Sequence, residues 1–310
     1  MVSSEINAHA PVLLPETIEG LRVRADGFYV DATYGRGGHA RAILDRLGPE
    51  GALLVIDRDP QAAAHARETI GCDTRVAVRQ ATFDRIGDYV AARSVAGVLF
   101  DLGVSSPQLD DGARGFSFLR DGPLDMRMDP TTGDSAADYL AHASEAEIVG
   151  VIFQFGEERF ARRIAAAIVA ARARVRIATT GELAEIVARA VPKREPGKHP
   201  ATRTFQALRM HVNRELELIE SALSAALDVL EVGGRLAVIS FHSLEDRLVK
   251  RYLRRLADGD PVWRGMPGAP ESSLPRIVLA GRAIRAGAAE VAANPRARSA
   301  TLRIAERVRA

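Results

Sequence analysis

The sequence has little cysteine and no long apolar run. Its 310 residues include one cysteine, Cys72, so an internal disulfide or a thiolate metal cluster is excluded. No uncharged apolar run approaches the roughly 18 residues of a membrane span, and the N-terminus lacks a basic segment followed by an apolar one. Because 47% of the residues are hydrophobic, the chain can bury a sizeable core, which excludes general disorder. We therefore expect a folded cytoplasmic protein with no membrane partner.

The net charge of +2 conceals an uneven distribution of charge along the chain. Residues 159–214 carry a net charge of +10 and residues 247–310 a net charge of +9, which leaves −17 for the remainder. Two basic blocks on an acidic body are typical of a surface for a polyanion such as nucleic acid. Solvated helix faces in an Arg-rich chain would give the same count, so charge alone leaves both interpretations open.

The first hundred residues alternate between strand and helix patterns. Four short apolar runs predict buried strands, at 28–31, 52–57, 75–78 and 97–101. Helix patterns lie between them at 39–47 and 60–69. Short strands that alternate with helices indicate an α/β fold, in which helices cover both faces of a parallel sheet.

The middle of the chain has a different pattern. Residues 103–134 repeat Gly, Pro and Asp without an apolar period, which is typical of a functional or disordered segment. Three helix patterns follow without a strand among them, at 145–154, 158–171 and 180–190. These features predict an all-helical insertion at 110–204.

The α/β pattern then resumes. Apolar residues from Phe205 to Leu230 recur at three- and four-residue steps, which predicts one long helix. Two further strands are predicted, at 235–241 and 300–305. We therefore expect residues 1–109 and 205–310 to form one discontinuous Rossmann-like domain around the insertion.

A glycine-rich loop joins the first predicted strand to the first predicted helix. Gly35, Gly37 and Ala40 fit the spacing G-x-G-x-x-G/A, in which missing side chains let the backbone turn tightly and approach a ligand. Asp57 ends the second strand about twenty residues further on, where an acid can accept both hydroxyls of a ribose. A tight turn without a ligand is the structural alternative.

Dinucleotide and S-adenosylmethionine sites share this geometry, and the surrounding charge separates them. A pyrophosphate favours positive charge at a helix N-terminus, whereas a sulfonium cofactor with an ammonium group favours acids near the loop. Asp31 before the loop and Asp101 at the end of the fourth strand favour S-adenosylmethionine, although Asp31 could instead cap the turn. The rival functions are an NAD(P)-dependent oxidoreductase and an RNA-binding assembly factor with a vestigial cofactor fold.

The single cysteine bears on which atom receives the methyl group. Methylation at carbon 5 of a pyrimidine ordinarily needs a thiolate, and Cys72 lies away from the carboxyl ends of the strands. We interpret Cys72 as a small buried hydrophobic residue, which leaves nitrogen or oxygen acceptors. Acceptors that grip the N–H groups of an exocyclic amine would stabilise its developing charge. Asp101, Ser105, Ser106 and Pro107 form a candidate amine clamp, a polar Ser-Pro turn being the alternative.

Ten segments then carry a resemblance to a known family, in order along nearly the whole chain. They are HAPVLLPE at 9–16, DATYGRGGH at 31–39, IDRDP at 56–60, DLGVSSPQLDD at 101–111, RGFSF at 114–118, DGPLDMRMD at 121–129, GEERF at 156–160, KHPATRTFQA at 198–207, SFHSLEDR at 240–247 and NPRAR at 294–298. On these segments the chain resembles the ribosomal RNA small-subunit methyltransferase H family, also called MraW.

The resemblance implies transfer of a methyl group from S-adenosylmethionine to N4 of a cytidine in the decoding region, at the P site, of 16S ribosomal RNA. The partner would be the RNA or the assembling small subunit, and a homodimer is possible. Carried over by position, the implied cofactor contacts are Gly37, Gly38, His39, Asp57, Phe83, Asp101 and Gln108, beside Gly35 of the loop.

Two groups of residues are candidates to face the RNA, the first from the resemblance and the second from its charge and its position in the chain. Phe241 and His242 would lie at the rim of the active site, where they could stack on or orient the base. Lys198, His199 and Arg203 precede the predicted long helix and are candidates for contacts with RNA phosphates. A solvated face is the alternative for these three side chains.

Two weaker patterns receive structural interpretations. Asp121, Asp125 and Asp129 are spaced by four, but the neighbouring prolines and the lack of His or Cys favour ordered turns, so we expect no metal site. Ser243 and Asp246 read as a helix-capping pair, because no G-x-S-x-G elbow surrounds the serine.

Overall fold

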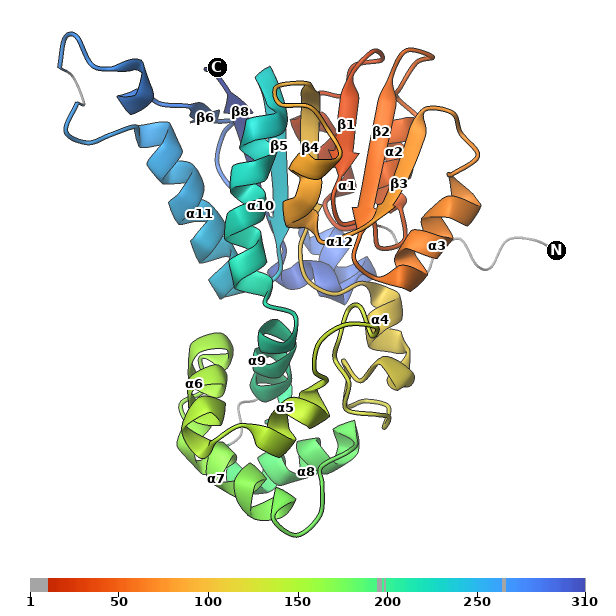
Figure 1. Cartoon of the computed structure of the whole chain (residues 1–310), viewed down its shortest axis with the longest axis vertical. Coiled ribbons are helices and arrows are strands. Elements are labelled where there is room, and N and C mark those ends of the chain that lie inside the picture. The colour runs from red at the N-terminus through yellow and green to blue at the C-terminus, as the bar shows by residue number, and fades with distance from the viewer. Residues whose placement is uncertain (1–10, 194–196, 198, 264–265, 310) are drawn as a thin grey trace. The chain divides into compact units, whose positions relative to one another are not determined.

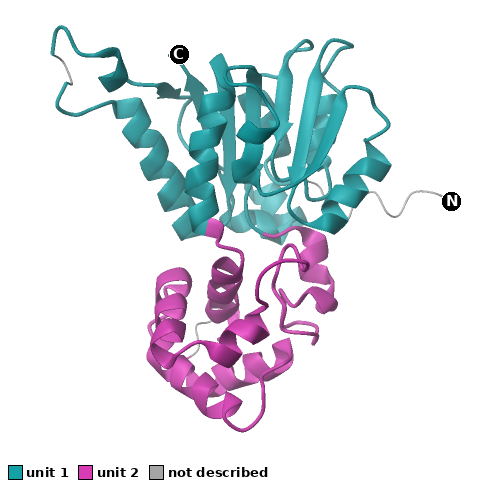
Figure 2. Cartoon of the chain, viewed as in Figure 1, with its two compact units in different colours: residues 1–103, 216–310 teal, residues 104–215 magenta. Residues whose placement is uncertain are grey.

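The computed structural model describes residues 11–193, 197, 199–263 and 266–309 (Figure 1). The chain divides into two compact units (Figure 2): unit 1 comprises residues 1–103 and 216–310, and unit 2 comprises residues 104–215. We expected the helical insertion to span 110–204. Unit 2 extends further at both ends. It extends past residue 204 because residues 205–212, which we assigned to the α/β domain, pack in its core, and it begins before residue 110 because Val104 and Leu109 pack against the same core.

Unit 1 contains one mixed sheet, with strand order β3-β2-β1-β4-β5-β8-β6 and β7 also paired to β8. The strands are β1 (Phe28–Asp31), β2 (Ala52–Asp57), β3 (Val76–Gln80), β4 (Val95–Asp101), β5 (Leu230–Ser240), β6 (Ile277–Leu279), β7 (Ile284–Arg285) and β8 (Thr301–Arg307). Strands β1 to β5 run parallel, whereas β8 is antiparallel to β5, β6 and β7. The α/β prediction is confirmed.

Helices cover both faces of this sheet. They are α1 (Leu14–Leu21), α2 (Gly38–Leu44), α3 (Pro60–Thr69), η1 (Phe83–Asp88), α10 (Glu215–Val229), α11 (Ser243–Asp258), η3 (Glu271–Ser273), α12 (Ala288–Ala293) and η4 (Pro295–Ser299). One core packs α1, α2 and α3 against one face of the sheet, and a second core packs α10 and α11 against the other. No helix within the described ranges is both long and apolar enough to cross a bilayer.

Local signals explain which elements the sequence predicted well. Strands β1 and β2 and helix α3 have the predicted bounds. Helix α3 begins where Asp59 accepts the backbone N–H of Gln61 at 2.9 Å and Pro60 occupies the first turn. The short strands β6 and β7 escaped prediction because two or three residues carry no readable period.

Unit 2 is helical. Its elements are α4 (Ser106–Asp110), η2 (Gly112–Arg114), α5 (Ala136–His142), α6 (Glu145–Gly156), α7 (Ala161–Arg172), α8 (Thr180–Ala190) and α9 (Thr202–Val212). Capping boxes begin α5, α6 and α8, since a Ser or Thr at each N-cap is followed three residues later by an acid. Within the described residues of unit 2 there is no strand, only an isolated bridge between Pro123 and Thr179.

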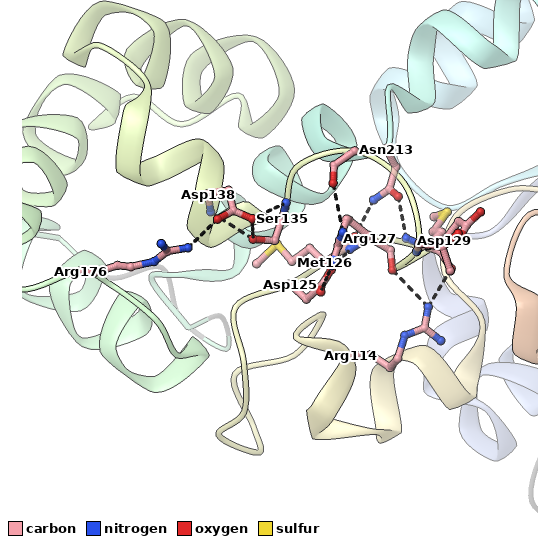
Figure 3. Close-up of polar contacts among 12 residues, drawn as sticks. Arg114, Asp125, Met126, Arg127, Asp129, Ser135, Asp138, Arg176 and Asn213 are labelled. Carbon is pink, nitrogen blue, oxygen red and sulfur yellow. Dashed lines mark hydrogen bonds and ion pairs between the residues drawn. The ribbon is translucent and has the colours of Figure 1, made fainter.

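The long irregular segment of unit 2 is ordered by polar contacts with a buried asparagine (Figure 3). The Asn213 side chain is 1% exposed; its Oδ1 accepts the Met128 N–H at 2.8 Å, and its Nδ2 donates to the Met126 carbonyl at 2.7 Å. The Arg114 guanidinium donates to the Met128 carbonyl at 2.8 Å. Residues 112–134 therefore form a defined structure without a repeating pattern.

The same asparagine ends a helix that we expected to continue. The prediction of one long helix from Phe205 to Leu230 is wrong: α9 ends at Val212 and α10 begins at Glu215. Arg214 between them has a left-handed backbone, with φ 51°, and the Asn213 amide also donates to the Arg209 carbonyl at 2.8 Å. The apolar residues of α9 pack in the core of unit 2, and those of α10 pack in a core of unit 1. Both helices therefore have an apolar face, and the sequence pattern runs through the break between them.

Candidate functional site

Three aspartates end neighbouring parallel strands of unit 1. Asp31 ends β1, Asp57 ends β2 and Asp101 ends β4. Strand β1 pairs with both β2 and β4, so the strand order reverses between β1 and β4. Ligands of such sheets bind at the carboxyl ends of the strands beside this reversal point. Asp31 and Asp101 therefore stand on either side of the expected binding crevice.

The glycine loop between β1 and α2 is held to β2 by Asp57. The Asp57 Oδ2 accepts the backbone N–H of Gly35 at 2.8 Å, and its Oδ1 accepts that of Asp59 at 2.9 Å. Gly35 and Gly37 have left-handed backbones, with φ 55° and 75°. A Cβ at Gly37 would lie 2.4 Å from the ring of Tyr34, so packing alone already requires glycine there.

Gly38 and His39 open helix α2 directly after this loop. A Cβ on Gly38 would lie 2.1 Å from Cγ of Pro11, so the helix approaches the N-terminal segment closely. His39 is 5% exposed, and its Nε2 lies 3.2 Å from the Val12 carbonyl oxygen. A carbonyl only accepts, so Nε2 carries the proton and Nδ1 carries the lone pair.

The His39 lone pair faces Asp101. Nδ1 of His39 lies 3.6 Å from Oδ2 of Asp101, and burial lowers the pKa of the imidazole to about 4. The ring is therefore neutral near pH 7 and provides Asp101 with no positive charge. The Asp101 backbone N–H donates to the Thr33 hydroxyl oxygen at 2.6 Å, which fixes the end of β4 against the loop.

Asp101 keeps one carboxylate oxygen without a hydrogen bond. Its side chain is 27% exposed, yet Oδ1 is buried and has no partner among the described residues. A buried unpaired acceptor costs about 1–3 kcal/mol, so this atom is a candidate to meet a donor from a ligand.

Burial raises the pKa values of all three strand-end carboxyls. The pKa of Asp101 is raised to about 8, by burial first and then by the charges of Asp31 and Glu245. Burial raises the pKa of Asp31 to about 7 and that of Asp57 to about 6. Raised carboxyl pKa values that gather at the edge of a sheet are typical of a functional site. No cation of the described residues acts on the pKa of Asp31 or Asp101, so the negative charge of the ionised pair is not neutralised by these residues.

The N-terminus of α11 lies at the same edge, after β5. Glu245 is completely buried, and its Oε2 accepts the backbone N–H groups of Phe241 at 2.8 Å and His242 at 3.3 Å. The predicted capping pair of Ser243 and Asp246 is wrong, because His242 is the N-cap residue and Glu245 its partner. The resemblance placed Phe241 and His242 at the rim of the site, and the structure positions their backbone through Glu245.

Asp246 has a different partner. Its carboxylate binds the Arg303 guanidinium of β8 through two contacts, at 2.8 and 3.1 Å. Glu245 and Thr33 are the residues near Asp101 that the sequence prediction missed. For Glu245 a signal existed, since His242-x-x-Glu245 has the spacing of a capping box at the end of a predicted strand.

Other predicted site residues belong to unit 2 or to a core. Ser105, Ser106, Pro107 and Gln108 begin α4, where Oε1 of Gln108 accepts the Ser105 N–H at 2.9 Å. Phe83 begins η1 and packs its ring edge-on against Phe100, with 5.8 Å between centroids. The contacts predicted for these residues with cofactor or base stay predictions.

The predicted RNA contacts lie in unit 2. Lys198 lies outside the described residues. The ring of His199 packs on Phe118 with centroids 4.6 Å apart, and Arg203 donates to the Glu157 carbonyl at 2.7 Å, at the end of α6. Both contacts are internal to the unit, so a role in RNA binding stays a prediction.

The cysteine and the spaced aspartates are placed as follows. Cys72 is exposed, so its interpretation as a buried hydrophobic residue is wrong; it precedes β3, at the opposite end of that strand from the site. Asp121 accepts the Gly181 N–H at 2.8 Å at the start of α8. Asp125 binds the Arg127 guanidinium, and Asp129 accepts the hydroxyl and N–H of a nearby threonine. The three aspartates thus take part in turns and caps, as the sequence interpretation expected.

Comparisons with known proteins identify the family of the chain. The model of the MraW methylase family matches residues 6–308. The chain is 54% identical over 301 residues to a protein named ribosomal RNA small subunit methyltransferase H from Xanthomonas euvesicatoria, covering 97% of this chain and 89% of that one. Its namesake from Xanthomonas oryzae is 53% identical with the same coverage. A solved rRNA methylase from Streptococcus thermophilus superposes with a TM-score of 0.43 and 13% identity over the whole chain and 99% of its own, a likeness that carries no argument about function. The chain belongs to the MraW methylase family and is an S-adenosylmethionine-dependent methyltransferase.

Proposed function

We propose that this enzyme methylates N4 of a cytidine in the decoding region of 16S ribosomal RNA. The curated relatives are named as methyltransferases of small-subunit ribosomal RNA, which supports the class of substrate. The choice of an exocyclic amine is supported by the acceptor at the end of β4. Asp101 holds a buried carboxylate oxygen with no hydrogen bond among the described residues, and an amine N–H would satisfy it.

The strand-end carboxyls fit the cofactor. Burial first, and then neighbouring carboxylates, raise the pKa values of Asp31 and Asp101: Asp57 acts on Asp31, and Asp31 and Glu245 act on Asp101. A sulfonium or ammonium charge beside them would lower those pKa values again. Asp57 is tied to the loop through one lone pair on each oxygen, which leaves further acceptor positions for ribose hydroxyls. S-Adenosylmethionine would therefore be held by Asp31, Asp57 and the glycine loop.

When bound, S-adenosylmethionine supplies an electrophilic methyl carbon, on which the N4 lone pair forms a bond as the carbon–sulfur bond breaks. The N4 lone pair is delocalised into the cytosine ring and is a weak nucleophile. An ionised Asp101 that accepts one amine N–H would favour a pyramidal nitrogen and stabilise the positive charge that develops on it. The base would have to leave its stack to reach this carboxylate.

After transfer the nitrogen carries one proton too many. Asp101 is placed to accept it, because its carboxylate would accept an N–H of the same amine and burial raises its pKa above the ordinary carboxyl value. The proton would then pass to water. His39 stays neutral throughout, because burial lowers its pKa to about 4.

The helix that follows β5 supplies the other side of the base site. Glu245 fixes the backbone of Phe241 and His242 without exposing any of its own surface. Phe241 is only partly buried, and we expect a base to stack on its ring. In unit 2, the turn at Ser105–Pro107 is the other candidate for gripping the amine.

Mass spectrometry of nucleosides tests this proposal. Ribosomal RNA from a strain that lacks the gene should lose the N4-methylated cytidine, and a plasmid carrying the wild-type gene should restore it. Complementation with Asp101→Asn should leave the nucleoside absent while the protein accumulates normally. An unchanged N4-methylcytidine level in the deletion strain would exclude this function and favour a binding role. Purified enzyme with free RNA or with small subunits would then identify the form of the substrate.

A further inference from the structure

A pocket of unit 1 lies between α11 and the antiparallel edge of the sheet. Its walls come from α11, from the connection between β6 and β7 and from β8, elements that Figure 1 shows beside one another. Four of its lining residues are basic: Lys250, Arg254, Arg282 and Arg303. None of the described residues that line it is acidic. The pocket therefore presents concentrated positive charge on a surface that the proposed mechanism does not use.

Two of the four cations have no acidic partner. Arg303 is neutralised by Asp246 through two short contacts, and Arg254 lies 3.6 Å from Asp258 in an exposed pair of little strength. Lys250 and Arg282 are exposed and form no ion pair with any residue that the structure describes. These two side chains give the pocket its net positive charge.

The floor and the size of the pocket restrict what can bind. Leu253 and Ile304 at its base are 1% and 8% exposed, while Leu279 at its margin is 46% exposed. An apolar floor beneath cations suits a group with a charged end and an uncharged body, such as a nucleotide. The cavity volume is about 130 Å³, below the ~300–1,000 Å³ of pockets that enclose a complete small molecule. One phosphate with part of its ribose fits this size better than a free cofactor.

Helix α11 connects the pocket to the methylation site. His242 caps the helix at the site, and Lys250 follows eight residues later, about 12 Å along the axis at 1.5 Å per residue. A stacked strand advances roughly 3.4 Å per nucleotide, so three or four nucleotides cover this distance. One RNA strand can therefore contact the start and the middle of α11 within unit 1.

We infer that this pocket binds a phosphodiester of the substrate RNA a few nucleotides from the methylated cytidine. Lys250 and Arg282 neutralise the phosphate, and the ribose lies toward Leu253 and Ile304. The inference rests on the proposed function because it takes RNA as the substrate. It adds a second contact point that would align the strand before the target base leaves its stack.

Binding of a decoding-region RNA fragment to the full chain, measured by fluorescence anisotropy from 50 to 200 mM salt, tests the inference. The double variant Lys250→Glu with Arg282→Glu is compared with Arg46→Glu with Arg67→Glu. The control changes the charge equally and alters exposed arginines near the opposite edge of the sheet. At 0.1 M salt the pocket variant should bind about tenfold more weakly. Its slope of log K against log salt should fall by roughly 0.7, the value for one lost phosphate contact on a single strand.

Three results would overturn the inference: equal affinity of the pocket variant and wild type, an equal loss in the control, or weakened binding with an unchanged salt slope. Titration with cytidine 5′-monophosphate tests a free nucleotide as the ligand. Tight binding of the nucleotide that the pocket variant loses, with RNA affinity unaltered, would also overturn it. The nucleoside measurement in the deletion strain is independent of these experiments, so failure of the pocket and failure of the proposed function are separable.

Discussion

The strand-end carboxyl groups of unit 1 differ from the carboxyl groups that cap and brace the loops of unit 2. At the strand ends of unit 1, Asp31 and Asp101 are buried near each other without a cation that acts on them, and burial raises their pKa values. In unit 2, the pKa of Asp138 is lowered by hydrogen bonds from Ser135 and then from Arg176, which lies 2.5 Å away (Figure 3). Burial opposes the change at Asp125, yet the Arg127 guanidinium lowers its pKa as well.

This difference separates the acids that shape the fold from those held ready for a ligand. A carboxylate that accepts Arg or backbone N–H groups is already satisfied and adds stability to its own loop or cap. A carboxylate that is buried without a cation lowers stability and remains able to bind a positive charge or an amine. The comparison predicts that substitutions of the strand-end acids lower activity more than stability, and that substitutions of the paired acids in unit 2 lower stability more than activity.

The largest expected effect is on turnover. Asp101→Asn keeps the size of the side chain but removes the carboxylate, so kcat should fall by about 10²–10³ or more with cofactor saturating. Stability should not fall, because the neutral amide avoids the cost of a buried charge. Single-turnover methylation and urea unfolding measure the two quantities. Near-normal turnover would exclude Asp101 from the clamp.

Asp125→Asn is the matched control in unit 2. It breaks the pair with Arg127, whose contacts are 2.7 and 2.8 Å, so stability should fall by about 1 kcal/mol. Turnover should stay within about twofold of wild type. If both variants lost the same activity, the separation of the two groups of acids would be wrong.

The next effect is on the stability of unit 2. Asn213→Ala removes a buried amide that bonds Met126, Met128 and Arg209, and the freed backbone groups should cost about 3 kcal/mol. Asn294→Ala in unit 1 removes a cap at the start of η4 and should cost about 1 kcal/mol. Hydrogen exchange should show faster opening of residues 112–134 in the Asn213 variant alone. Equal losses in the two variants would contradict the central role of Asn213.

Local sequence patterns made part of the fold and of the site predictable, whereas contacts between residues far apart in the chain did not. Strands β1 and β2 were predictable from short apolar runs, and parallel strands bring Asp31, Asp57 and Asp101 to one edge by topology. The break after α9 was not predictable, because the apolar period continues through it and Asn213 bonds to residues more than eighty positions earlier. Glu245 could be read as a capping residue, but its influence on Asp101 could not, since that depends on how the fold brings the start of α11 near the end of β4.

A smaller effect is expected at two glycines with the same backbone and different surroundings. Gly37 in unit 1 has φ 75°, and Gly133 in unit 2 has φ 70°. Alanine at either position should cost roughly 1 kcal/mol for the left-handed backbone. Gly37→Ala must also displace the Tyr34 ring, 2.4 Å from its Cβ, whereas a Cβ at Gly133 meets no described atom within 4 Å. Thermal unfolding and cofactor calorimetry should therefore show an additional loss of stability and weaker cofactor binding for Gly37→Ala only. Equal effects would contradict a tightly packed loop.

A gradual effect is the fall in stability as the pH rises above neutrality. The folded pKa values of Asp31 and Asp101, about 7 and about 8, exceed the ordinary value of 3.8, so the folded state holds more protons than the unfolded state between these limits. Stability must then decrease as pH rises through that window. His39 acts in the opposite direction from about pH 4 to 6.5, because burial lowers its pKa, but it contributes nothing above 6.5. The free energy of unfolding without cofactor should therefore drop by on the order of 1–2 kcal/mol from pH 6.5 to 8.

Unit 2 provides the internal comparison for this pH effect. The lowered pKa values of Asp125 and Asp138 place their contribution to stability above the ordinary carboxyl pKa, so it is lost only in acid and is constant from pH 6.5 to 8. Urea unfolding at constant ionic strength should show the decrease in wild type and a smaller decrease in Asp101→Asn. Bound cofactor should reduce it too, because a positive charge beside the cluster favours the ionised carboxyls in the folded state. Constant or rising stability over this range would show that the strand-end carboxyls are already ionised, and the distinction between the acids of the two units would fail.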